Sequence, residues 1–89
     1  MSTYVSEMRS CAPNKNWCWN ENAYLMADTL AELHKFATAI GMRDTWFQSD
    51  SRWPHYDLTR NKRAQALRLG AKPIMIMDYM RERQHKRHV

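Results

Sequence analysis

The sequence has few of the features that define several protein classes. Its only cysteines, Cys11 and Cys18, are too few for a disulfide framework and predict free thiols in a reducing cytoplasm. No run of about 18 apolar residues is present, so we expect no membrane span. The opening residues MSTYVSEMRS also lack the apolar run of a signal peptide. Both glycines, Gly41 and Gly70, stand where a helix would end.

Length and charge set further bounds. The chain has 89 residues and 44% hydrophobic residues, which predicts one domain over residues 1–89 with a thin core. The formal net charge is +5, and most of it lies in the C-terminal part. These basic residues are Arg60, Lys62, Arg63, Arg68, Arg81, Arg83, Lys86 and Arg87. Such a balance suits association with polyanions.

Periodicity and end signals predict three helices and three strands. The clearest helix begins after the capping box Thr29-x-x-Glu32 and ends before Gly41. A second helix is expected from about Thr59 to Leu69, and a basic C-terminal helix over 78–88. The expected strands cover 3–6, 45–48 and the continuous apolar run 73–77. Between the first strand and first helix, 8–26 reads as a long Asn-, Trp- and Cys-containing loop.

This order, β-α-β-α-β-α, predicts an α/β fold. Right-handed crossovers favour a small three-stranded parallel sheet of order 2-1-3, with helices on both faces. Ligands of such sheets bind beyond the carboxyl ends of the strands. The acidic and histidine side chains expected at that edge are Glu7, Asp28, His55, Asp57 and Asp78. The cationic ones are Arg9, Arg60, Lys62 and Arg63, three of them at a helix N-terminus that suits a phosphate.

Several segments together resemble a known family. They are VSEMR (5–9), ADTLAELH (27–34), WFQ (46–48), HYDL (55–58) and GA (70–71). Their order is similar to that of the domain-of-unknown-function family DUF4031, short bacterial and phage proteins, over nearly the whole chain. The resemblance implies no established activity.

Two positions depart from the family pattern. Ser6 stands where members usually have Asp, and members carry a Cys-His pair shortly before the Ala-Asp. Here Cys18 is followed by Trp19, and Tyr24 stands nearest to the place of the His. If that Asp and His act in catalysis in the family, this chain has lost or altered the activity.

The preferred hypothesis is a noncatalytic binding protein for a phosphate-bearing ligand, most simply nucleic acid. Its expected ligand-binding residues are Arg9, His55, Asp57, Arg60, Lys62 and Arg63. Cations would contact phosphates, and Trp17, Trp19 or Trp53 would stack on unpaired bases. No cofactor is expected. The competing interpretation is a solvated charged face, diluted by acidic residues such as Asp44 and Glu82.

Other hypotheses remain open from the sequence. One is a site for Mg²⁺ or Mn²⁺ that would hydrolyse a phosphoester. Its oxygen and imidazole ligands would come from Glu7, Asp28, His55, Asp57 and Asp78. The competing interpretation is that Asp28 and Asp78 only cap helices.

A second alternative is a phage-type module that binds a host protein through the tryptophans Trp17, Trp19 and Trp53. A zinc site from both cysteines and a histidine of the tail is a third, although six residues between the cysteines is a wide spacing. Unpaired sheet edges would also allow a homodimer.

Overall fold

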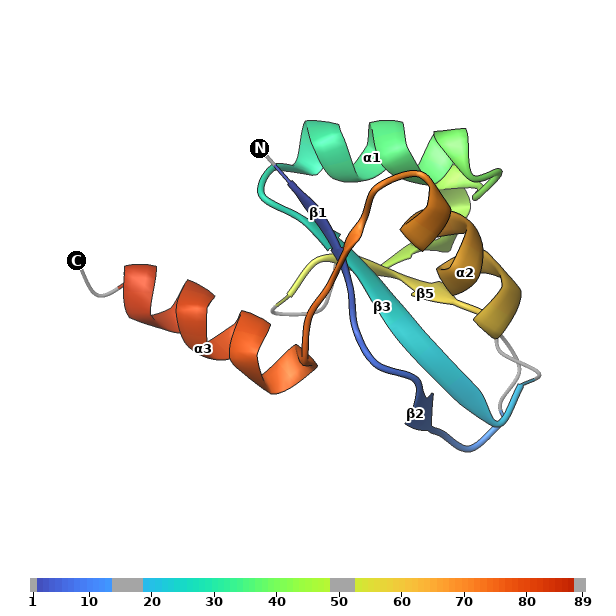
Figure 1. Cartoon of the computed structure of the whole chain (residues 1–89), viewed down its shortest axis with the longest axis horizontal. Helices are drawn as coiled ribbons and strands as arrows, with labels where there is room; N and C mark the ends of the chain where they lie inside the picture. Colours follow the sequence, from blue (N-terminus) through green and yellow to red (C-terminus); the bar gives the residue numbers. More distant parts are fainter. Residues whose placement is uncertain (1, 14–18, 49–52, 88–89) are drawn as a thin grey trace.

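The computed structural model describes residues 2–13, 19–48 and 53–87, with side chains as far as residue 83. The elements run in the order β1 (Thr3–Val5), β2 (Arg9–Ser10), β3 (Glu21–Ala27), α1 (Leu30–Ala39), the 3₁₀ helix η1 (Asp44–Trp46), β4 (Phe47–Gln48), β5 (His55–Leu58), α2 (Arg60–Arg68), β6 (Lys72–Pro73) and α3 (Ile76–Arg87). Figure 1 shows α1 and α2 close together, with α3 set apart from them. None of these helices is long and apolar enough to cross a bilayer.

The described strands form one mixed sheet of order β4-β5-β3-β1-β6, with β2 paired to β3 outside this path. β1 runs antiparallel to β3 and parallel to β6, while β3–β5, β4–β5 and β2–β3 are antiparallel. The α/β class is therefore confirmed. The three-stranded parallel sheet of order 2-1-3 is wrong, because a strand that the sequence did not predict lies beside β1.

That unpredicted strand is β3, inside the segment expected to be a loop over 8–26. Its residues ENAYLMA alternate in direction: Ala23 and Leu25 are buried in one cluster, while Met26 is buried in another on the opposite face. Sequence reasoning missed it because Glu, Asn and Ala are poor strand formers. Pairing with β1 on one side and β5 on the other satisfies its backbone and outweighs the propensity.

One face of the sheet carries the main core and both α1 and α2. Leu33, Ala37 and Ile40 of α1 and Ala66 of α2 pack with the strand residues Val5, Ala23, Leu25, Tyr56 and Leu58. Thr29 caps α1 as predicted, since its Oγ1 accepts from the Glu32 N–H at 3.2 Å and donates to Glu32 Oε1 at 3.3 Å. Gly41 (φ +79°) follows that helix. The crossover helices thus share a face instead of lying on opposite ones.

α3 packs against the other face through Ile76 and Tyr79, which contact Met26. The predicted strand over 73–77 is wrong, because pairing with β1 covers only Lys72–Pro73. After the Ile74 N–H donates to Val5 O, the Ile76 N–H donates to Glu7 Oε1 at 3.0 Å, and the helix begins there. A carboxylate at a helix N-terminus is favourable. Asp78 therefore lies in the first turn of α3 and is not its N-cap.

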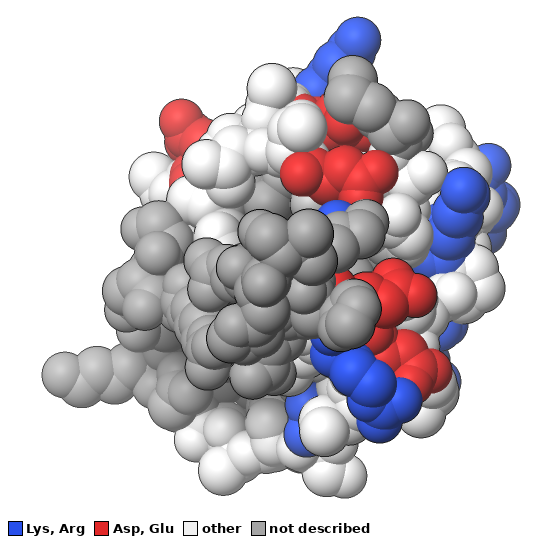
Figure 2. Space-filling model, turned by 90° about the vertical axis from the view of Figure 1, so that its left-hand side faces the viewer, with Lys and Arg blue, Asp and Glu red and all other residues white. Residues whose placement is uncertain are grey.

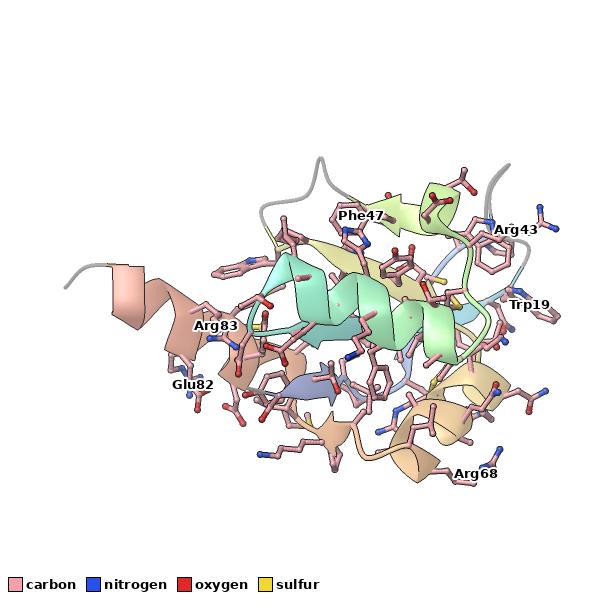
Figure 3. The ribbon with its side chains drawn as sticks, turned by 90° about the horizontal axis from the view of Figure 1, so that it is seen from above. Trp19, Arg43, Phe47, Arg68, Glu82 and Arg83 are labelled. Atoms are coloured by element: carbon pink, nitrogen blue, oxygen red, sulfur yellow. The ribbon has the colours of Figure 1, made fainter. Side chains whose placement is uncertain are left out.

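A cluster around Arg83 holds α3 near the start of α1. Its guanidinium donates to Asp28 Oδ1 and lies 5.8 Å from the Tyr4 ring centroid and 4.9 Å from that of Tyr79. Asp28 also accepts from the Ser2 N–H at 2.9 Å and from Tyr4 OH at 3.2 Å. Figure 3 shows Arg83 beside the sheet, at the opposite end of the molecule from Trp19.

The second predicted strand also differs from expectation. Residues 45–48 were predicted as a strand, but η1 occupies Asp44–Trp46 and only Phe47–Gln48 pairs, at the sheet edge. His55–Leu58, where no strand was predicted, forms β5 between β4 and β3. His55 and Asp57 therefore project from a strand, and their side chains have fixed directions.

Candidate functional site

A pocket lies where the start of β3 meets the start of α2. Its volume is about 210 Å³. It is lined by Trp19, Asn20, Glu21, Thr59, Arg60 and Asn61. Trp19 is 53% exposed and projects from the molecule at this end in Figure 3. The pocket thus joins the tryptophan expected to stack on bases with an arginine expected to bind phosphate, although the two lie far apart in sequence.

The start of α2 forms one wall of this pocket. Thr59 is the N-cap of α2, because its Oγ1 accepts from the Lys62 N–H at 3.2 Å and its carbonyl accepts from the Arg63 N–H at 2.9 Å. The predicted helix from about Thr59 is therefore confirmed. The first N–H groups of an α-helix have no acceptor within the helix and favour anions. Arg60 and Asn61 present such groups beside the pocket.

An ion pair crosses the pocket from one wall to the other. Arg60 Nε donates to Glu21 Oε2 at 3.0 Å, and Arg60 Nη2 donates to Glu21 Oε1 at 2.7 Å. This hydrogen bonding lowers the pKa of the Glu21 carboxyl, with a further contribution from the charge of Arg60. The Arg60 side chain is 69% exposed and that of Glu21 36% exposed, so both are accessible from solvent.

Two of the other three basic residues expected to bind the ligand, Lys62 and Arg63, have internal partners. Lys62 Nζ donates to the Ile40 carbonyl at 2.6 Å, at the end of α1, and Arg63 Nε donates to the Ser6 carbonyl at 2.7 Å. Both bonds tie α2 to neighbouring elements. Arg9 is exposed on β2, where it pairs in register with Asn22 of β3. Of the four predicted cations, only Arg60 lines the pocket.

His55 and Asp57 form a second polar group, on the face of the sheet opposite α1 and α2. His55 Nε2 lies 3.6 Å from Asp57 Oδ1, and His55 Nδ1 lies 2.7 Å from the Trp53 carbonyl. The ring of Tyr24 packs on the His55 ring with centroids 4.1 Å apart. Asn22 Nδ2 donates to Asp57 Oδ1 at 3.1 Å. The prediction that His55 and Asp57 lie together is thus confirmed, while the pocket lies elsewhere.

The electrostatics of Asp57 follow from these neighbours. Burial acts to raise the pKa of the carboxyl, but the nearby His55 ring and a hydrogen bond from Asn22 stabilise the charged form more strongly, so the pKa falls below its ordinary value of 3.8. Asp57 is therefore ionised at neutral pH and is partnered within the protein.

The predicted rim of acidic side chains does not form. Glu7 binds the start of α3, Asp28 binds Arg83, and Asp78 pairs with Arg81 at 3.3 Å. Burial acts to raise the pKa of Asp28, but hydrogen bonds from Arg83, Ser2 and Tyr4 lower it overall. The rim required three parallel strands, and the antiparallel β1–β3 pair removes that geometry. Among residues 2–13, 19–48 and 53–83, no three His, Cys, Asp or Glu groups converge as a metal site.

The remaining tryptophan, cysteine and histidine candidates lie in different places. One tryptophan packs in the core, one thiol lies near Trp19 of the pocket, and the others lie outside the described residues. Trp53 is partly buried and packs edge-on to Tyr79, with ring centroids 6.3 Å apart, so it covers the sheet. Cys11 is a free thiol whose Sγ lies 3.7 Å from the Trp19 carbonyl. Trp17, Cys18 and His88 lie outside the described residues, which leaves the zinc hypothesis and part of the partner surface as predictions.

Sequence reasoning missed most of the pocket lining. Asn20, Glu21, Thr59 and Asn61 were not singled out as site residues, and the partners Glu21 and Arg60 are 39 positions apart. A local signal existed only for Thr59, a favourable N-cap residue before a helical segment. The pairing of β3 with β5 brings the two walls together, and this pairing was not predicted.

The fold and pocket define a small mixed α/β domain with an accessible arginine and tryptophan at one end of its sheet. The family model described as "Protein of unknown function (DUF4031)" matches residues 3–86, and the chain belongs to this family. Searches of the curated proteins and of the solved structures each gave no significant match.

Ser6 and Tyr24, the two positions expected from the sequence to depart from the family pattern, are hydrogen-bonded to each other. Ser6 is fully buried, and its Oγ accepts from the Tyr24 N–H at 2.8 Å and donates to the Glu7 carbonyl at 2.9 Å. Tyr24 in turn stacks on His55. The Ser6–Tyr24 bond joins the end of β1 to β3, and the Tyr24 ring covers His55.

Proposed function

We propose that this protein binds single-stranded nucleic acid at the pocket between β3 and α2. The observation that carries the proposal is the presence of an exposed Trp19 and the guanidinium of Arg60 in one pocket. Every nucleobase has a face that can stack on an indole, and every nucleotide carries a phosphate that an arginine can bind through two hydrogen bonds. One nucleotide would use both groups at once.

The chemistry of the pocket wall supports the same ligand. Asn20 and Asn61 offer amide donors and acceptors, Thr59 offers a hydroxyl, and the start of α2 offers backbone N–H groups. The net charge of +5 adds a long-range attraction for a polyanion. The proposal concerns binding alone, because the carboxylates expected to hold Mg²⁺ or Mn²⁺ are engaged in other hydrogen bonds.

The distribution of charge favours a single strand over a duplex. Figure 2 views the end of the molecule that carries α3, away from the pocket, and shows acidic side chains beside basic ones on that face. Along α2, Lys62 and Arg63 bind backbone carbonyls of the protein. A duplex-binding surface needs several free cations in line with the phosphates. A local pocket with a stacking side chain needs only a few contacts.

Two single substitutions test the proposal. Fluorescence anisotropy with a labelled single-stranded DNA of about 12 nucleotides, within the usual range of site sizes, measures affinity. Trp19→Ala should weaken binding about tenfold, because one stacked base is lost. Arg60→Ala should weaken binding and reduce the slope of log affinity against log salt by about 0.7, the value for one phosphate contact on a single strand.

Matched substitutions elsewhere control for general effects. Trp46 is 46% exposed on η1 and Arg68 is exposed at the other end of α2, so Trp46→Ala and Arg68→Ala remove the same groups outside the pocket. Both variants should bind nearly as the parent does. Wild-type affinity in both Trp19→Ala and Arg60→Ala, or no binding by the parent at low salt, would reject the proposal.

A further inference from the structure

The Arg60–Glu21 pair occupies the part of the pocket that a phosphate would need. Both partners come from ordered elements, since Glu21 is the first residue of β3 and Arg60 the first residue of α2. The carboxylate takes two donors of the guanidinium, at 3.0 Å from Nε and 2.7 Å from Nη2. Carboxylate and phosphate oxygens bind this planar group in the same two-bond geometry. One edge of Arg60 therefore binds only one of the two anions at a time.

Exchange between the anions is feasible because the pair is accessible. The side chains are 69% and 36% exposed, and ion pairs with this exposure are weak. A carboxylate released from Arg60 would be solvated without a large loss. While the pair is intact, however, the negative charge of Glu21 offsets the positive charge of Arg60 at the pocket.

We propose that Glu21 is an internal competitor for the ligand phosphate at Arg60, so that binding exchanges a carboxylate for a phosphate on the same guanidinium. This inference rests on the proposed function, because it takes the nucleic-acid phosphate as the incoming anion. Glu21 lowers affinity for strands that place a phosphate on Arg60, because its carboxylate must first leave the guanidinium. A strand therefore binds only if its contacts outweigh the loss of the Arg60–Glu21 ion pair.

A double-mutant cycle tests the competition with the same labelled single-stranded DNA of about 12 nucleotides. Glu21→Gln keeps the size of the side chain and removes its charge, and it should raise affinity roughly two- to fivefold, because the competing pair is a weak surface ion pair. In an Arg60→Ala background, Glu21→Gln should change affinity by less than about 1.5-fold, since no guanidinium remains to be released.

A charge control separates competition from general repulsion. Glu82 is exposed on α3, and Figure 3 shows it far from Trp19, at the other end of the molecule. Glu82→Gln makes the same change in net charge and should raise affinity less than Glu21→Gln does. Circular dichroism and thermal unfolding confirm that each variant is folded.

The outcomes distinguish the two proposals. If parent and Glu21→Gln both fail to bind the strand at low salt, the proposed function is wrong and the inference falls with it. If the parent binds through Trp19 and Arg60 but Glu21→Gln gains no more than Glu82→Gln, the function stands and the competition is overturned. A gain from Glu21→Gln that persists in Arg60→Ala would likewise overturn it, because the effect would be nonspecific repulsion.

Discussion

The two faces of the sheet are built from the same strands but held by different forces. On the face that carries α1 and α2, Val5, Leu25 and Leu58 are fully buried in an apolar cluster. On the other face, alternate residues of those strands include Tyr24, which stacks on His55, and Asp57, which accepts a hydrogen bond from Asn22. Burial of apolar area stabilises the first face, while the second combines a smaller apolar cluster around Met26 and Ile76 with a few specific polar contacts.

Because of this difference, we expect the residues that stabilise the domain to differ from the residues that bind its ligand. The apolar face positions β3, β5 and α2, whose ends form the pocket, without contributing a polar group to it. The polar face holds α3 and the His55–Asp57 pair. We expect substitutions on the apolar face to act mainly on the free energy of unfolding. Substitutions at the pocket should act mainly on binding.

The largest effect is expected in the apolar cluster. Leu25→Ala should lower the free energy of unfolding by about 3 kcal/mol, through lost transfer energy and a cavity that the neighbours only partly fill. Met77→Ala, at a side chain that is 62% exposed, should change it by less than about 0.5 kcal/mol. Urea denaturation followed by circular dichroism measures both. Similar losses in the two variants would mean that this face does not hold the core.

A smaller effect is expected where the polar face holds α3. Arg83→Ala should cost about 1 to 2 kcal/mol, because it removes the bond to Asp28 and two ring contacts from a partly buried site. Arg81→Ala is the matched control, since Arg81 is 75% exposed and pairs only with Asp78 among described side chains. Proteolysis near α3, compared between the two variants, shows whether the helix detaches. Equal rates would contradict the role given to Arg83.

Substitution of the two N-cap threonines should have equal effects on stability and unequal effects on binding. Thr29→Ala and Thr59→Ala each remove a hydroxyl that accepts a helix N–H, which should cost about 1 kcal/mol. Only Thr59 lines the pocket. Thermal unfolding should therefore shift alike in both variants, while affinity for single-stranded DNA falls only in Thr59→Ala. A loss of affinity in Thr29→Ala would place the binding surface elsewhere.

The smallest effect concerns acid stability of the polar face. The pKa of Asp57 is lowered by its partners, so its contribution is complete above the ordinary value of 3.8 and is lost as the pH falls through the folded-state pKa. Asp57→Asn should therefore flatten the decline of unfolding free energy between about pH 5 and pH 3. Asp78→Asn, at an exposed pair, should keep the parental slope. A parental slope in Asp57→Asn would show that the carboxylate contributes little.

The sequence predicted best the elements whose signals are local. α1 and α2 begin after Thr29 and Thr59 as expected, because a hydroxyl at the N-cap bonds an N–H only three residues away. Gly41 and Gly70 follow these helices with positive φ, which glycine adopts without strain. The α/β class follows from the same signals. Arg60, expected to bind phosphate, and Trp19, expected to stack on a base or to bind a partner, both line the pocket, and their roles stay predictions.

The sequence alone thus determined the ends of two helices, the basic charge and the candidate groups. The tertiary structure decided which of these groups meet. β3 has weak strand propensity and forms because β1 and β5 pair with both of its edges. Residues 73–77 do not form one strand: Pro73 ends β6, and α3 begins at Ile76. The helix begins there because Glu7, distant in sequence, binds the Ile76 N–H. Long-range hydrogen bonds and burial outweigh local preference at these places, and they bring Trp19, Glu21 and Arg60 into one pocket.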